Sequence, residues 1–251
     1  MDGGDGVKIT RYGNYLAGTP WGWLSASVTT FAIVLASTAL AVLLLSPFVQ
    51  GEGIDSNGAV TPLMLLVMLI AQVLMVVLVY LAAGSWGARP DALLALQPAR
   101  GGRAAYIVCL GVMAVGVVVY AILAYQLRPQ DLKSDLAPFM TLVRSDTWWW
   151  LLLLVVAVGA PLSEEMLFRG FLFPALLKTP LGFLGASVLS SVAWTSLHLS
   201  YSPTGLLEIF LIGLFLCAVL WWTGSLWVAI ACHGAYNAGL TLFLRFFGGP
   251  V

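Results

Sequence analysis

Residues 148–169 read WWWLLLLVVAVGAPLSEEMLFR, an apolar run that ends in two adjacent glutamates and an arginine. A membrane-spanning helix needs about 20 mostly apolar residues, so this stretch predicts a span that carries charge within it. A charged side chain near the bilayer centre costs roughly 2.5–3.5 kcal/mol on insertion scales. Such residues are expected to face the protein interior or a water-filled cavity, where they serve a function.

The composition around this stretch is that of a polytopic membrane protein. Of the 251 residues, 61% are hydrophobic and 9% are charged, and the mean hydropathy is +0.98. The formal net charge of +0 argues against a nucleic-acid partner, because such proteins carry a basic surface. The three cysteines have no CxxC spacing and lie in apolar segments, so we interpret them as small buried hydrophobic residues: Cys109, Cys217 and Cys232.

Apolar segments recur along the whole chain. We expect transmembrane helices at 21–49, 61–84, 105–127, 148–177, 183–199, 204–222 and 226–247. They must be helices, because lipid offers the backbone no hydrogen-bond partner. The predicted fold is therefore an all-α, polytopic transmembrane bundle of about seven to eight helices. Between the second and third spans, residues 85–103 predict an interfacial helix bounded by Pro90 and Pro98.

The polar residues divide the chain into three parts. Residues 1–20 form a polar tail, residues 21–140 contain N-terminal transmembrane helices with few polar groups, and residues 141–251 hold nearly all the intramembrane polar side chains. We therefore expect the chemistry of the protein in the last part.

The first polar motif is PLSEEMLFRG, residues 161–170. Pro161 has no N–H to donate, so it frees a carbonyl one turn earlier. Glu165 and Arg169 are i,i+4 neighbours that can pair, which leaves Glu164 without a counter-ion close in sequence. Taken alone, the motif also fits an ion-pair cluster at a helix end.

Two further motifs contain the only histidines. In WTSLH, Trp194 and His198 lie one turn apart on one helix face. In HGAYN, His233 and Asn237 share a face, and the small residues around them favour close helix packing. Each motif alone also fits a hydrogen-bonded clamp between helices.

Together the three motifs supply a water-activating site. Such a site needs a base, an imidazole and a donor for the developing negative charge. The candidates from three helices are Glu164, His198, His233 and Asn237. Two imidazoles and a carboxylate can also hold Zn²⁺ with positions left open for water, and the ligands would then be Glu164, His198 and His233. The chain lacks the HExxH motif of thermolysin-type zinc helices.

The order of these motifs resembles the CPBP family of intramembrane proteases, which includes type II CAAX prenyl endopeptidases and bacterial Abi-type membrane proteins. The family pattern is EExxxR, FxxxH and HxxxN. EExxxR corresponds to Glu164, Glu165 and Arg169, and HxxxN to His233 and Asn237, preceded by TGSLW at 223–227. In the middle motif Trp194 replaces the usual phenylalanine before His198. The similarity covers about residues 148–247.

The resemblance implies an endopeptidase that hydrolyses membrane-associated or lipidated substrates, with residues 141–251 as a CPBP-like catalytic core. Glu164 and His198 would activate water, and His233 and Asn237 would position it or stabilise the oxyanion. Glu165 and Arg169 would support the site. Although the family is often labelled as metalloproteases, we favour a glutamate-type mechanism that requires no cofactor, with Zn²⁺ as the alternative. The expected partners are membrane lipid and a peptide or protein substrate.

Two other functions fit part of the pattern. A catalytically silent scaffold or bacteriocin self-immunity factor would tolerate loss of Glu164. A transporter would use the same buried acids, but it should show interrupted helices in both halves of the chain. Glu208 lies outside the three motifs, and it either lines the cavity or reaches the interface.

Lysine and arginine residues predict the orientation. With the N-terminus in the cytoplasm, seven lie inside and four outside. The inner set is Lys8, Arg11, Arg89, Arg100, Arg103, Arg169 and Lys178, and the outer set is Arg128, Lys133, Arg144 and Arg245. The excess favours a cytoplasmic N-terminus, and we expect a prokaryotic inner-membrane protein with the Glu164 end of the site nearer the cytoplasm.

Overall fold

The computed structural model describes residues 10–12, 15–48, 61–85 and 89–248. Six helices in this part of the chain are long and apolar enough to cross a membrane: α1 (Trp23–Leu45), α2 (Pro62–Gly84), α4 (Gly102–Leu127), the segment Trp149–Leu176, α10 (Pro203–Thr223) and α11 (Leu226–Phe247). The predicted polytopic helical bundle is therefore confirmed. Residues 1–9 and 13–14 of the expected polar tail lie outside the described residues.

Shorter elements connect the long helices. Strands β1 (Thr10–Tyr12) and β2 (Tyr15–Ala17) pair antiparallel, with Thr10 opposite Ala17. The short helices are η1 (Ser46–Phe48), α3 (Pro90–Leu93), α5 (Pro129–Arg144), α9 (Gly182–Thr195) and the 3-10 turn η4 (Ser196–His198). Of the interfacial helix expected at 85–103, residues 86–88 lie outside the described part, and among the described residues only α3 is helical before α4 begins.

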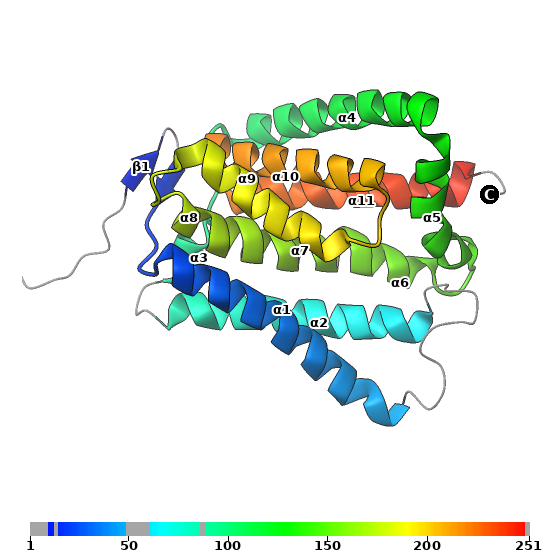
Figure 1. The fold of residues 1–251 in the computed structure, drawn as a ribbon, viewed down its shortest axis with the longest axis horizontal. Coiled ribbons are helices and arrows are strands. Elements are labelled where there is room, and N and C mark those ends of the chain that lie inside the picture. Colours follow the sequence, from blue (N-terminus) through cyan, green and yellow to red (C-terminus); the bar gives the residue numbers. More distant parts are fainter. Residues whose placement is uncertain (1–9, 13–14, 49–60, 86–88, 249–251) are drawn as a thin grey trace, which may run out of the picture.

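The segment expected to span the membrane at 183–199 is shorter than that. Its α-helical part, α9, has 14 residues, fewer than the about 20 that a span needs. The polar stretch 129–144, in contrast, forms the helix α5 between two of the expected spans, where no helix was predicted. Figure 1 shows α5 crossing one end of the bundle, while β1 and α3 lie at the opposite end.

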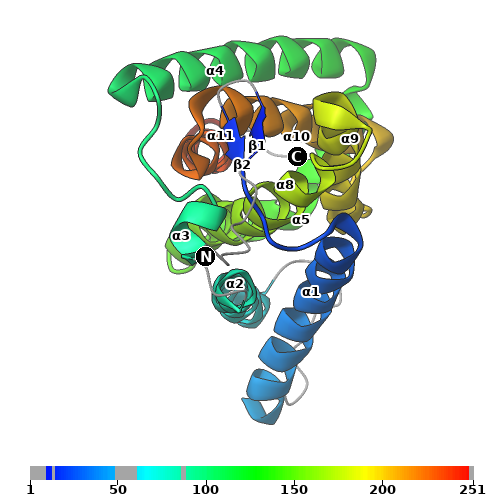
Figure 2. The same cartoon turned by 90° about the vertical axis from the view of Figure 1, so that its left-hand side faces the viewer.

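Trp149–Leu176, hereafter the central segment, lies inside the bundle. It comprises α6 (Trp149–Leu154), η2 (Val155–Gly159), α7 (Ala160–Glu164), η3 (Glu165–Leu172) and α8 (Phe173–Leu176), of which η2 and η3 are π-helical. Of its most apolar 18-residue stretch, 50% is buried inside the protein, against 17% for α4. Figure 2 shows α4 on one side of it and α1 with α2 on the other. The central segment is therefore the element that the other helices enclose.

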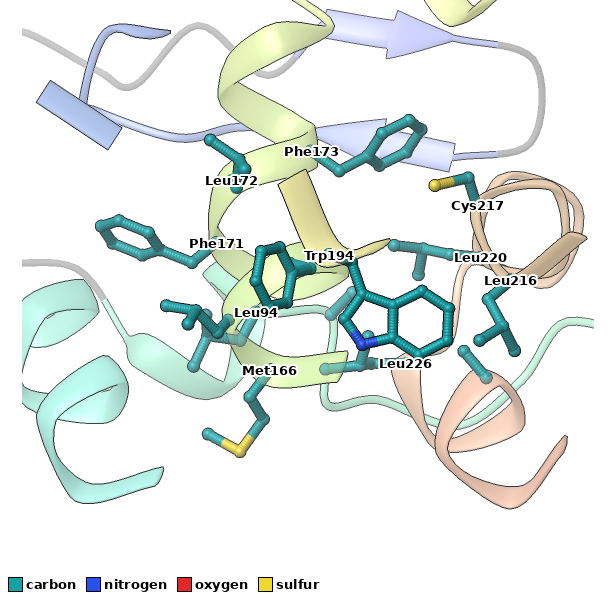
Figure 3. Packing of buried hydrophobic residues seen from close by; sticks show 14 of the residues in the cluster. Leu94, Met166, Phe171, Leu172, Phe173, Trp194, Leu216, Cys217, Leu220 and Leu226 are labelled. Carbon is teal, nitrogen blue, oxygen red and sulfur yellow. The ribbon is translucent and has the colours of Figure 1, made fainter. Parts of the chain in front are cut away.

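Apolar side chains from several helices pack around η3. Phe171, Trp194 and Leu226, which come from the central segment, α9 and α11, are all nearly inaccessible to solvent. Figure 3 shows Trp194 and Leu226 on the side of the central segment that faces Leu216 of α10, with Phe171 on the other side. All three cysteines are buried and free, as the sequence predicted.

Pro161 determines how α11 docks on the central segment. Because proline has no N–H, Pro161 can donate neither to the carbonyl of Ala157, four residues earlier, nor to that of Val156, five residues earlier. The Asn237 amide of α11 donates to the Val156 carbonyl over 2.6 Å. A Cβ on Gly234 would lie 2.7 Å from the Ala157 carbonyl oxygen, so only glycine allows this approach.

Replacing Gly234 with alanine is expected to lower the free energy of unfolding by about 1–3 kcal/mol, the usual cost of overpacking. The rigid backbone carbonyl of Ala157 cannot move aside cheaply. Gly239→Ala on the same helix is the matched control, because a Cβ there meets nothing within 4 Å. Thermal unfolding in detergent measures both variants, and equal midpoints would contradict this account of the docking.

Candidate active site

A buried ion pair with a histidine lies at the start of η3. Arg169 Nη1 donates to Glu165 Oε1 over 3.0 Å, and both side chains have 0% exposure. This is the i,i+4 pair that the sequence predicted. His233 Nδ1 lies 2.9 Å from the same Glu165 oxygen. A carboxylate only accepts hydrogen bonds, so Nδ1 of His233 carries the proton.

Glu164 points to a different partner, as its angular offset from Glu165 requires. Its Oε2 accepts a hydrogen bond from the indole Nε1–H of Trp194 over 2.5 Å. The Glu164 side chain is half-buried, whereas Glu165 is fully buried. Adjacent glutamates thus have separate environments, one closed around Arg169 and one partly accessible.

His198 lies on the turn η4 that ends α9. Its Nδ1 is 3.2 Å from the backbone carbonyl of Trp194. Because a carbonyl only accepts, Nδ1 donates, and in the neutral ring Nε2 remains free to accept a proton. The His198 and His233 rings stand edge-on to the Trp194 indole at centroid distances of 5.4 and 5.2 Å. Both imidazoles therefore contact the same indole.

Asn237 lies one turn after His233 on α11. One N–H of its amide is used by the Val156 carbonyl. A primary amide has two N–H donors, so a second one remains. The structure therefore brings Glu164, His198 and His233 around Trp194 and holds Asn237 on the same face of α11 as His233.

A polar cluster beyond the three motifs anchors the loop between α9 and α10. Asp135 of α5 accepts hydrogen bonds from the Ser202 N–H and hydroxyl, each 2.7 Å long. Asp131 accepts from the Thr204 hydroxyl over 2.5 Å. The sequence analysis missed this cluster, although Asp131 and Asp135 stand one helical turn apart and Ser202 before Pro203 is a helix-start signal.

Glu208 and two tyrosines extend the site toward this loop. The Tyr236 hydroxyl donates to Glu208 Oε1 over 3.0 Å, joining α11 to α10. The Tyr201 ring lies 5.9 Å from the His198 ring. Burial first, and then nearby carboxylates led by Asp135, raise the pKa of Tyr201 to about 12. Its phenol is therefore a neutral hydrogen-bond donor at physiological pH.

The polar residues lie toward the α5 end of the bundle. Figure 1 shows α9 ending, and α10 beginning, beside α5 and away from β1. Glu164 lies near the middle of the central segment. His198 follows the end of α9 and Glu208 lies near the start of α10, so both come from the parts of these helices beside α5. The prediction that the Glu164 end of the site lies nearer the cytoplasm depends on the membrane orientation and stays a prediction.

The residues considered as zinc ligands do not assemble into a metal site. Among the described residues, no group of three His, Cys, Asp or Glu side chains is close enough to hold a metal ion. Trp194 occupies one oxygen of Glu164, and both histidines direct Nδ1 at protein oxygens, which leaves Nε2 of each ring open. The separation of the three side chains, and not their hydrogen bonds, therefore keeps them from holding one Zn²⁺ ion in this arrangement.

Comparison with known proteins identifies the class. Residues 146–239 match the family model described as type II CAAX prenyl endopeptidase Rce1-like. The matched region contains all three motifs, so the resemblance drawn from them is confirmed, and the match supports a membrane-embedded endopeptidase in general terms. Searches of curated proteins and of solved structures found no match.

Proposed function

We propose that the protein is an intramembrane endopeptidase in which Glu164 and His198 activate a water molecule. The observation that carries this proposal is the convergence of both residues on Trp194, which contacts Glu164 through its indole N–H and His198 through its carbonyl. A carboxylate and an imidazole held in fixed positions are suited to general-base catalysis.

Hydrolysis follows from the roles of these atoms. Glu164 Oε1 takes a proton from water while Nε2 of His198 accepts the second water hydrogen bond. The water oxygen bonds to the carbonyl carbon of the substrate, and the carbonyl oxygen becomes an oxyanion. As the carbon–nitrogen bond breaks, Glu164 passes its proton to the leaving amine. The products are one carboxyl and one amino terminus.

His233 and Asn237 are the proposed donors to the oxyanion. The Nδ1 proton of His233 is directed at Glu165, so His233 must be an imidazolium to donate from Nε2. Glu165 then balances one of the two cations, His233 and Arg169, and a positive charge remains beside the reaction centre. Electrostatic stabilisation of this kind is often the largest contribution to catalysis. Glu165 and Arg169 support the site without touching the substrate.

Metal removal is expected to leave cleavage unchanged. The purified protein, dialysed against a chelator until metal analysis finds no stoichiometric Zn²⁺, should cleave at the rate of the untreated sample. Loss of activity on dialysis that returns when Zn²⁺ is added would instead establish the metalloprotease alternative and require Glu164, His198 and His233 to come closer together.

The proposal is tested by comparing peptide termini in membranes. Cells lacking the protein would express either the wild type or Glu164→Ala at matched levels. New termini that depend on the wild type alone would establish the peptidase and reveal its substrates, including whether they are lipidated. Identical termini in both samples, with a wild-type phenotype retained by Glu164→Ala, would favour the scaffold or self-immunity alternative.

A transporter remains less well supported than a peptidase. Transporters are typically built from repeated halves with matching broken helices. Among the described residues, the π-helical interruptions fall only in the central segment, and the buried ion pair lies there too. The described π-helical interruptions and the buried ion pair thus lie in one half of the chain, and not in both.

We further propose that the N-terminus is cytoplasmic. Arg169 no longer counts as a loop charge, because it is buried in the bundle. Of the seven basic residues on the N-terminal side six then remain, against four on the α5 side. The positive-inside rule still favours a cytoplasmic N-terminus. Under this orientation the α5 end of the site faces the outside, so substrates would reach it from the extracytoplasmic side.

Cysteine labelling in intact cells tests this orientation. Ser134 on α5 and Ser85 after α2 are both exposed serines at opposite ends of the bundle. We expect a membrane-impermeant maleimide to label Ser134→Cys in intact cells and Ser85→Cys only after permeabilisation. The wild type serves as the blank, because its three cysteines are buried. The reverse pattern would place the site on the cytoplasmic side.

A further inference from the structure

Trp194 contacts more of the candidate site than any other residue of the three motifs does. Its indole meets Glu164 through a hydrogen bond, and both histidine rings approach it edge-on. The guanidinium carbon of Arg169 lies 4.3 Å from the ring centroid, a cation–π contact. Only 3% of Trp194 is exposed. Burial and the contacts with Arg169 and both histidines therefore hold the indole in place independently of its hydrogen bond to Glu164.

The hydrogen bond to Glu164 is specific to tryptophan at this position. Phenylalanine, the usual residue of the resembled motif, would keep an aromatic ring beside both histidines but has no hydrogen-bond donor. Indole has a single N–H donor, and here it is directed at Oε2 of a carboxylate 30 positions earlier in the chain. Hydrogen bonds to ionised acceptors are shorter and roughly twice as strong as neutral ones.

We propose that Trp194 is a positioning residue that holds the Glu164 carboxylate in its reactive orientation through the indole N–H, and holds His198 through its backbone carbonyl. This inference rests on the proposed function. With Oε2 occupied by the indole, Oε1 is the oxygen that remains to receive the proton of water. The carbonyl fixes the His198 tautomer at the same time. One residue thus orients both groups that act on the water.

Trp194→Phe separates this role from packing. We expect kcat to fall about 10- to 100-fold with KM unchanged, as for loss of a hydrogen bond to a charged group. Site-specific benzothienylalanine at position 194, which keeps the bicyclic shape but replaces N–H by sulfur, should behave like Trp194→Phe. Trp222→Phe is the matched control, because Trp222 is 48% exposed on α10. Wild-type kcat in both position-194 variants would overturn the proposal while leaving the peptidase intact.

A second measurement does not depend on activity. In protein labelled with ¹⁵N at the tryptophan indoles, the signal that disappears in Trp194→Phe identifies Trp194. We expect this signal to lie downfield and to shift upfield in Glu164→Gln, because the acceptor loses its charge, while Trp222→Phe leaves it in place. An indole signal that Glu164→Gln does not move would overturn the proposal. If the wild type cleaves no peptide, the shift of this signal in Glu164→Gln alone tests whether Trp194 holds Glu164.

Discussion

Glu164→Gln is expected to reduce peptide cleavage by about 10²- to 10⁴-fold, the usual contribution of a general base. Glutamine has nearly the same shape and cannot take a proton from water. Its amide oxygen can still accept the Trp194 indole N–H, which now reaches the Glu164 carboxylate over 2.5 Å. The bundle should therefore remain folded. Initial cleavage rates on a substrate found by terminus comparison measure the effect.

Asp91→Asn is the matched control, because it also replaces a carboxylate with an amide but lies far from the candidate site. Asp91 pairs with Arg89 at the end of the bundle opposite α5. That pair is largely exposed, so its loss should change neither cleavage nor unfolding. Full activity in Glu164→Gln would remove Glu164 from its proposed role, and a peptidase would then need another base.

Arg169→Met is expected to lower the free energy of unfolding by about 3–5 kcal/mol, because it leaves a buried carboxylate without its partner. Glu165 and Arg169 both have 0% side-chain exposure. The methionine fills part of the same space but offers no charge. His233 still contacts Glu165, but it does not replace the hydrogen bond and the permanent charge of the guanidinium. Unfolding in detergent, followed by tryptophan fluorescence, measures the loss.

A double variant tests the physical cause. In Glu165→Leu/Arg169→Met no buried charge is left uncompensated, so most of the stability should return. Cleavage should remain impaired, because His233 has lost the carboxylate that orients its ring. Arg89→Met is the control for the arginine change, since that pair is solvent-exposed and should not affect unfolding. A double variant as unstable as Arg169→Met would contradict this explanation.

Much of the fold was predictable from apolar segments. Their length predicted six of the long helices, because lipid imposes helical structure on any span. The same argument failed at α9, whose apolar composition resembles a span but whose helix has 14 residues. It also failed at α5, because this helix is polar and contains Pro138, so no apolar segment indicates it. There the contacts of Asp131 and Asp135 with the α9–α10 loop stabilise the helix, and these are tertiary.

The site shows the same division between local and distant contacts. The i,i+4 spacing predicted the Glu165–Arg169 pair, because helical geometry alone places them together. The contact of Trp194 with Glu164 joins different helices, so no local spacing contains it. That Pro161 frees a backbone carbonyl was predictable. That the Val156 carbonyl accepts a hydrogen bond from the Asn237 amide was not, because it depends on where α11 docks.

The central claim is that Glu164 is the general base that activates water to attack a peptide bond. The most direct test is cleavage by purified protein in ¹⁸O-labelled water, with mass spectrometry of the new carboxyl terminus. We expect one heavy oxygen per product with the wild type and essentially no product with Glu164→Gln. Labelled product at equal yield from both proteins, or no product from the wild type with a substrate that it cleaves in membranes, would contradict the claim.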